Sequence, residues 1–432
     1  MILLLQSSRN MLQRWSLRVG FALIDQALFS GANLILNICL ARWTNVTEYG
    51  AFATITAVFL ILTSFYDAFV LEPMMIIGPS KYGRNFGGYL SALVLIHLLI
   101  TMFFGLVLFL ISRFLFPQSS LQNGMLVAGI SMPVILFVWF ARRAGYTIGR
   151  QGLSASVSLT YFIVLIISVM VLLTIGHLST PTAWVCQVIA GMMSAFTFLL
   201  QTRILVIPST TLLREVAIAH LSYSWWIVLS SVFSIGVYHV QSIVLAMLIG
   251  LDAAGAIRAI SILTFPATHI ISAISVLVLP VIANDFGRGD LESVRSRSFS
   301  VMGVLAIFTG IYLLGLVLFA NELDIIVYGG RYTEYMGLSG VLGLIPVFSA
   351  VTLGFSLVLR AIQRPEHYLI STSISGGLGF IFSISLTSAF GLIGAAVAMI
   401  IPYLSAAIVN YLMYKKWFPK YDCSDVDRYT NS

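Results

Sequence analysis

Four polar side chains share one face of an apolar segment near the start of the chain. The segment is centred near residue 30, and the four are Gln26, Ser30, Asn33 and Asn37. If each residue of a helix turns by about 100°, they fall within an arc of about 60°. Amide groups are costly to bury in hydrocarbon unless they find partners or water. We therefore expect this face to line a hydrated cavity; the alternative is that it only permits close helix packing.

A similar polar face recurs at an offset of 205 residues. At this offset the first face maps onto three other polar residues, Ser231, Tyr238 and Ser242, and Ser224 extends it by one heptad. The second apolar segment carries Thr56, Thr63 and Asp67 on one face, and these map onto Ser261, Thr268 and Ser272. We therefore expect the first, second, seventh and eighth spans to share a duplicated polar face, which places the candidate cavity between two halves.

The local sequence around these segments also suggests a duplication. The stretch from Ala41 reads ARWTNVTEYGAFATITAVF, and the stretch from Ala246 reads AMLIGLDAAGAIRAISILT. Identities are few, but in both an apolar run ends, a polar turn follows, and an N-cap type residue, Thr47 or Asp252, precedes a new apolar helix. Chance similarity between two apolar stretches is the alternative.

Acidic residues within or near the spans are functional candidates because charges are rare in lipid. Asp25 and Asp67 are expected to bind or release a coupling cation, H⁺ or Na⁺. The alternative for Asp25 is an ion pair with Arg14 or Arg18 near the cytoplasmic interface. Glu72 adjoins a proline at the end of a span and is expected at the interface.

Arg258 is a basic residue that lies on the outer side within a helical pattern. It is expected either to meet a phosphate as a fixed cation or to extend to the outer interface. His97, His220, His239 and His269 lack the spacing of metal ligands, so we expect no metal site. His239 is the most interesting of them because it adjoins the polar face of the seventh span.

The whole chain has the composition of a membrane protein. Of its 432 residues 59% are hydrophobic and 9% are charged, whereas soluble domains carry about 25% charged residues. Apolar runs long enough to cross a hydrocarbon core of about 30 Å are centred near residues 30, 62, 99, 132, 164, 191, 235, 269, 309, 347, 377 and 402. We predict an all-α polytopic membrane protein with about twelve transmembrane helices in two parallel six-helix halves around a central cavity.

The distribution of basic residues predicts the orientation in the membrane. With twelve spans and both termini cytoplasmic, nineteen of the 23 Lys and Arg residues, Arg142 and Arg143 among them, fall on inner segments. Four remain on the outer side, Arg42, Arg113, Arg258 and Arg331. Lys and Arg collect on cytoplasmic loops, so this asymmetry explains the net charge of +7 without a nucleic-acid partner.

We expect four parts along the chain. They are an N-terminal six-helix half at 1–202 with an N-terminal interfacial segment, a cytoplasmic linker at 203–219, a C-terminal six-helix half at 220–414 and a cytoplasmic tail at 415–432. No GxxxxGK[ST] loop is present in the sequence, and its three cysteines imply no disulfide framework. We expect no cofactor and no ATP site, so transport would be driven by a gradient or by the substrate.

Several stretches resemble motifs of one transporter family. LARWTNVTEYGAFA is similar to the AR-x-L-x-x-x-x-YG signature of polysaccharide transporters. The second half carries VLPVIANDFGRGDLESVRSRS, IIVYGGRYTEY and LRAIQRPEHY, which resemble the P-x-x-(S/A), G-x-x-Y and A-x-x-(R/K) positions of that family. The chain thus resembles the Wzx-type O-antigen and oligosaccharide flippases of the multidrug/oligosaccharidyl-lipid/polysaccharide exporter superfamily. It departs from their pattern at Trp43, Thr44 and Asn45, where the usual residues are Leu-Gly-Pro.

The resemblance implies a bacterial inner-membrane flippase and not an enzyme. Its substrate would be a polyprenyl-diphosphate-linked oligosaccharide for O-antigen, capsule or exopolysaccharide assembly, and its partners would be membrane lipids, H⁺ or Na⁺ and other polysaccharide assembly proteins. Gln26, Asn33, Asn37, Tyr238 and Ser242 would contact glycan, Arg258 the diphosphate, and Asp67 or Asp25 the coupling cation.

Three other functions stay open. A multidrug/cation antiporter of the same superfamily would have the same spans, but acidic residues should dominate its cavity. A membrane enzyme of glycan polymerisation is disfavoured by the short outer loops, the longest of which runs from about Asn321 to Tyr335. A scaffold that transports nothing is the third alternative.

Overall fold

The chain folds into helices joined by short turns. The structure is a computed structural model that describes residues 2–114, 120–202, 208–362 and 366–418. Eleven helical segments of this part are long and apolar enough to cross a membrane. The last of them, α16 (Glu366–Trp417), bends at Gly391, where φ is 60°, and so joins two spans. The predicted all-α polytopic membrane fold with about twelve spans is confirmed.

The chain divides into two compact units, residues 1–231 and 232–432. The division falls within one helix, α8 (Thr210–Tyr238), so residues 210–219 of the expected linker form its first turns. The boundaries predicted at 202 and 220 therefore remain a proposal.

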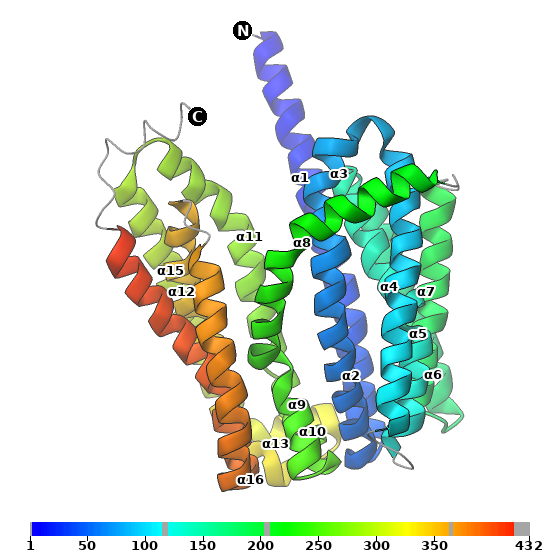
Figure 1. Cartoon of the computed structure of the whole chain (residues 1–432). Helices are drawn as coiled ribbons and strands as arrows, with labels where there is room; N and C mark the ends of the chain where they lie inside the picture. Colours follow the sequence, from blue (N-terminus) through cyan, green and yellow to red (C-terminus); the bar gives the residue numbers. More distant parts are fainter. Residues whose placement is uncertain (1, 115–119, 203–207, 363–365, 419–432) are drawn as a thin grey trace. The chain divides into compact units, whose positions relative to one another are not determined.

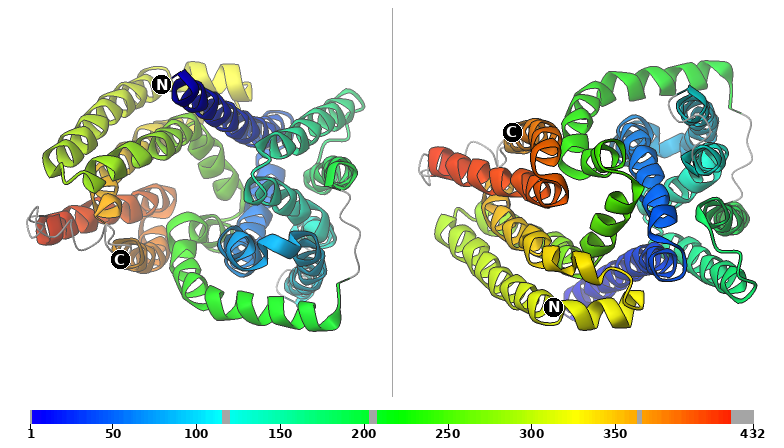
Figure 2. Two further views of the ribbon diagram at one scale, coloured as in Figure 1. Left: turned by 90° about the horizontal axis from the view of Figure 1, so that it is seen from above. Right: turned by 90° about the horizontal axis from the view of Figure 1, so that it is seen from below.

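Unit 1 is built around the helix in the middle of its sequence. Its helices are α1 (Ile2–Trp43), α2 (Val46–Tyr66), α3 (Glu72–Tyr82), α4 (Phe86–Phe114), α5 (Ser120–Thr147), α6 (Gln151–Thr174), α7 (Thr180–Thr202) and the first part of α8. α5 packs against α2, α4, α6 and α7, and α1 packs along α6 (Figure 1, Figure 2). Polar side chains that face α5 are therefore removed from solvent.

Unit 2 contains the end of α8 and the remaining helices. They are α9 (Val240–Leu248), α10 (Leu251–Ile262), α11 (Phe265–Gly287), α12 (Leu291–Leu318), α13 (Ala320–Leu323), α14 (Ser339–Leu342), α15 (Leu344–Ala361) and α16. A buried apolar cluster that includes Ile282, Val294, Leu305 and Leu357 lies where α11, α12 and α15 pack together.

Local sequence sets the helix ends, with two corrections to the expected caps. α2 is capped by Asn45, whose Oδ1 accepts a hydrogen bond from the Glu48 amide at 2.6 Å, and not by Thr47. α10 begins after Gly250, whose φ of 130° suits glycine, and not after Asp252. Asp290 caps α12 by accepting a hydrogen bond from the Ser293 amide at 2.9 Å, and this bond lowers the pKa of its exposed carboxyl.

In the described part of the chain, three spans are interrupted. The second contains a π-turn at Asp67–Leu71, the seventh breaks at His239 between α8 and α9, and the eighth breaks at Leu263–Thr264 between α10 and α11. Interrupted helices free backbone carbonyls, which must find donors in lipid. At the break of the eighth span Tyr312 donates to the Leu263 carbonyl at 2.6 Å.

Candidate functional site

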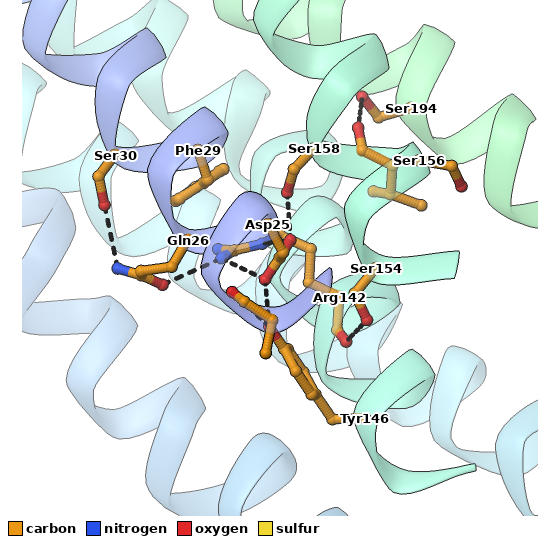
Figure 3. A network of polar contacts seen from close by, with 12 residues as sticks. Asp25, Gln26, Phe29, Ser30, Arg142, Tyr146, Ser154, Ser156, Ser158 and Ser194 are labelled. Atoms are coloured by element: carbon orange, nitrogen blue, oxygen red, sulfur yellow. Dashed lines mark hydrogen bonds and ion pairs between the residues drawn. The ribbon is translucent and has the colours of Figure 1, made fainter. Parts of the chain in front are cut away.

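A buried carboxylate network lies at the start of the first span (Figure 3). Arg142 donates Nε to Asp25 Oδ1 at 2.8 Å and Nη2 to Oδ2 at 2.9 Å. The Tyr146 hydroxyl donates to Oδ2 at 2.6 Å, and the Ser158 hydroxyl donates to Oδ1. Asp25 is completely buried. The Asp25 carboxylate thus accepts four hydrogen bonds from α5 and α6, and the Arg142 guanidinium balances its negative charge.

Two residues of this network bear on the sequence analysis. The side chains of Arg14 and Arg18, the alternative partners considered for Asp25, lie outside the described part of the chain, and the described partner is Arg142. Arg142, predicted on an inner segment, is buried in α5, where its guanidinium also lies 4.0 Å from the ring centroid of Phe29. The long separation in sequence, 117 residues, hides this pair from pattern analysis.

The polar face of α1 is satisfied largely within its own helix. Asn33 donates its amide to the Phe29 carbonyl and Asn37 donates to the Asn33 carbonyl, both at 2.8 Å. Gln26 is exposed and donates to the Ser30 hydroxyl at 3.0 Å. Asn37 is buried, so the accessible members of this face of unit 1 are Gln26, Ser30 and Asn33.

The polar face of α2 leads into the π-turn. Thr63 is buried and donates to the Phe59 carbonyl at 2.9 Å. Asp67, the first residue of the π-turn, is half-buried and makes no side-chain hydrogen bond or ion pair within the described part of the chain. Its carboxylate interacts electrostatically with Arg143 and Glu72. Asp67 therefore differs from Asp25, because its carboxylate has room for a further ligand.

Two histidines flank this π-turn, and sequence analysis set both aside. His97 of α4 contacts the Tyr66 hydroxyl through Nδ1 at 2.7 Å and the Pro133 carbonyl through Nε2 at 2.9 Å. His220 of α8 contacts the Tyr89 hydroxyl through Nε2 at 2.8 Å and the Phe69 carbonyl through Nδ1 at 2.9 Å. The only signal in the sequence was that His97 and His220 are histidines within apolar spans.

The predicted residues of the second half are dispersed. Ser231 is the last residue of unit 1 and donates to the Ile227 carbonyl at 2.9 Å. In unit 2 Tyr238 is 59% exposed, and Ser242 lies half-buried in α9 beyond the helix break. Thr268 and Ser272 lie on α11 and donate to carbonyls of their own helix.

Arg258 of α10 is the basic group at the interrupted spans of unit 2. The side chain is half-buried, and its buried Nε has no hydrogen-bond partner among the residues that the structure describes. Among the described residues no carboxylate forms a salt bridge with it. Its guanidinium carbon lies 5.3 Å from the ring centroid of Phe265, and His239 is within electrostatic range. Arg258 thus presents a positive charge that this part of the chain leaves uncompensated.

Comparison with solved structures identifies the fold. No family model and no curated protein sequence matches the chain. The inward-facing conformation of a multidrug resistance MATE family transporter of the MOP superfamily has a TM-score of 0.75 at 12% identity, over 94% of this chain and 99% of that one.

Two further solved structures have the same fold. The lipid II flippase MurJ in an inward closed conformation has a TM-score of 0.69 at 15% identity, over 92% of this chain and 87% of that one. A variant of the Vibrio cholerae MATE transporter VcmN has a TM-score of 0.64 at 15% identity, over 97% of this chain and 99% of that one. The chain is therefore a multi-pass membrane protein with the fold that these transporters and this flippase share.

Proposed function

We propose that this protein is a flippase that moves a polyprenyl-diphosphate-linked oligosaccharide from the cytoplasmic to the outer leaflet of a bacterial inner membrane. It would serve O-antigen, capsule or exopolysaccharide assembly by alternating access and would not act as an enzyme. The observation that carries the proposal is the uncompensated guanidinium of Arg258 beside two helix breaks.

The diphosphate is the part of such a substrate that Arg258 suits. A charged residue within a membrane span is costly and is retained for pairing or function. The guanidinium is planar, always charged and suited to two parallel hydrogen bonds with a phosphate. An anionic substrate would supply the missing counter-charge, whereas a cationic drug would be repelled.

Polar and aromatic side chains could receive the glycan. A sugar headgroup carries many hydroxyls that hydrocarbon cannot satisfy, so it needs a polar path while its lipid tail stays among acyl chains. Gln26, Ser30 and Asn33 of unit 1 and Tyr238 and Ser242 of unit 2 are accessible within their own units. We propose that these side chains contact the glycan.

Asp67 is the candidate for a coupling cation. Asp25 is ill suited to this role because its oxygens already accept from Arg142, Tyr146 and Ser158. Asp67 is half-buried and without a described hydrogen-bond partner, so its carboxylate is available to H⁺ or Na⁺. Because Glu72 lies within electrostatic range of Asp67, the multidrug/cation antiporter is the second candidate function.

Reconstituted vesicles distinguish the two functions. The purified chain would be placed in proteoliposomes with a fluorescent polyprenyl-diphosphate oligosaccharide, and an impermeant reagent would report how much label reaches the opposite leaflet. We expect flipping that depends on the diphosphate, so the same lipid with a neutral linkage should not move. Efflux of a cationic dye from the same vesicles, with no flipping of any tested glycan lipid, would instead establish the antiporter.

A further inference from the structure

The first half of α8 packs against the rest of unit 1 through a narrow stripe of buried side chains. Val216, His220 and Ser224, spaced by four residues, are 0%, 2% and 0% exposed, whereas Leu221 and Trp225 are more than half exposed. A spacing of four keeps these residues on one side of a helix. The imidazole of His220 therefore lies at the centre of this buried stripe.

The hydrogen bonds of His220 define the role of each ring nitrogen. Nδ1 faces the Phe69 carbonyl at 2.9 Å and must carry the proton, because a carbonyl only accepts. Nε2 then accepts from the Tyr89 hydroxyl at 2.8 Å. Tyr89 is itself fixed by a stacked contact with Tyr82, whose ring centroid lies 4.6 Å away.

The Phe69 carbonyl needs this donor because of the local sequence. In an α-helix its partner would be the amide of the residue four positions later. That residue is Pro73, which has no N–H. Phe69 lies in the π-turn that begins at Asp67, and a carbonyl without a donor in a membrane span is costly.

We propose that His220 is a positioning residue that replaces the backbone hydrogen bond removed by Pro73. In doing so it fixes the π-turn that carries Asp67 and fastens the first half of α8 to that turn. Its hydrogen-bonding role needs no particular substrate; only its value for ion coupling through Asp67 rests on the proposed function.

A contact at the outer edge of the stripe supports the same attachment. Glu215 accepts from the Tyr82 hydroxyl at 3.1 Å and pairs with Lys81 at 3.0 Å. Both groups of the ion pair are about half exposed, so the pair adds little stability. Of these polar contacts, those of His220 are shielded from solvent, whereas the Lys81–Glu215 pair is not.

A double-mutant cycle with Pro73 tests the proposal directly. Pro73→Ala restores an N–H that can donate to the Phe69 carbonyl, so it should make His220 dispensable. The measurement is hydrogen–deuterium exchange of the purified full chain, without substrate, in peptides covering residues 66–76. His220→Leu should raise exchange about tenfold in the parent chain and less than about threefold in the Pro73→Ala chain.

Two further variants distinguish the loss of the Nδ1–H donor of His220 from the loss of the imidazole volume. His220→Asn keeps an N–H near the place of Nδ1 and should preserve protection of the π-turn, which also covers the case in which His220→Leu fails to fold. Tyr89→Phe removes only the bond at Nε2, so Pro73→Ala should not rescue its effect.

Equal effects of His220→Leu in the two backgrounds would overturn the proposal, as would unchanged exchange in the parent chain. Because the assay uses no substrate, a failure of glycan flipping in vesicles leaves it unaffected.

Discussion

Arg142 holds Asp25 by both carboxylate oxygens, with Nε to Oδ1 at 2.8 Å and Nη2 to Oδ2 at 2.9 Å. The pair joins the first and fourth spans inside unit 1, where Asp25 is completely buried. A buried pair of this kind adds little net stability, but removal of one partner leaves an uncompensated charge. The ion pair therefore points to a structural role for Asp25 within unit 1.

Loss of the Asp25 charge should destabilise the chain. We expect Asp25→Asn to lower the free energy of unfolding by about 3–5 kcal/mol, because Arg142 stays buried without a counter-charge. Asp25→Leu with Arg142→Met should recover most of this loss. Chemical unfolding in detergent measures both, with Arg113→Leu, at an exposed position of α4, as the control. An Asp25→Asn protein of unchanged stability that has lost its dependence on an ion gradient would contradict this view.

Arg258 should control transport without controlling stability. Arg258→Leu should reduce flipping of a diphosphate-linked lipid at least tenfold, since a charge-assisted hydrogen bond contributes about 1.5–3 kcal/mol. Arg258→Lys should retain part of the activity because it keeps the charge but not the fork geometry. Arg113→Leu, at an exposed position of α4, is the matched control. Normal flipping by Arg258→Leu would remove the main support for the proposed function.

Asn33 should matter for the glycan more than for the fold. Within the described part of the chain, its amide bonds to the carbonyl of Phe29, one turn earlier in the same helix. We expect Asn33→Leu to lower glycan transport while unfolding changes by less than about 0.5 kcal/mol. Thr54→Val, at a buried residue that donates to the Gly50 carbonyl, is a control expected to leave transport unchanged. If the Asn33→Leu, Asn37→Leu double variant exported glycan as well as the parent at normal protein levels, this face of α1 would be excluded as a glycan-binding surface.

Glycines of α16 should determine whether α8 and α16 can approach each other in unit 2. A Cβ at Gly376 would overlap the Phe233 carbonyl, whereas a Cβ at Gly377 would meet nothing within 4 Å. Gly376→Ala should therefore destabilise the chain by more than about 2 kcal/mol through overpacking. Gly377→Ala should be neutral or stabilise by up to about 1 kcal/mol, as alanine favours a helix. Thermal unfolding that ranks the two variants in the opposite order would contradict this packing.

The functional candidates show why a helical pattern is an incomplete guide to a site. The arc that Gln26, Ser30 and Asn33 share was predictable, because 3.6 residues per turn fix which positions lie on one side of a helix. The same pattern grouped these residues with Asn37, whose side chain the structure buries. Whether a polar position meets solvent depends on the neighbouring helix, which periodicity does not specify.

Sequence by itself determined that the chain enters lipid, that it forms about twelve membrane-spanning helical segments and where each span is centred. These properties depend on local composition and on the need of every backbone group in lipid for a hydrogen bond. Only the tertiary structure decided that Asp25 pairs with Arg142, that His220 bonds to the Phe69 carbonyl left by Pro73, and that the Nε of Arg258 finds no partner among the described residues. Such pairings join residues far apart in the chain, and they arise only when packing brings separate helices within hydrogen-bonding distance.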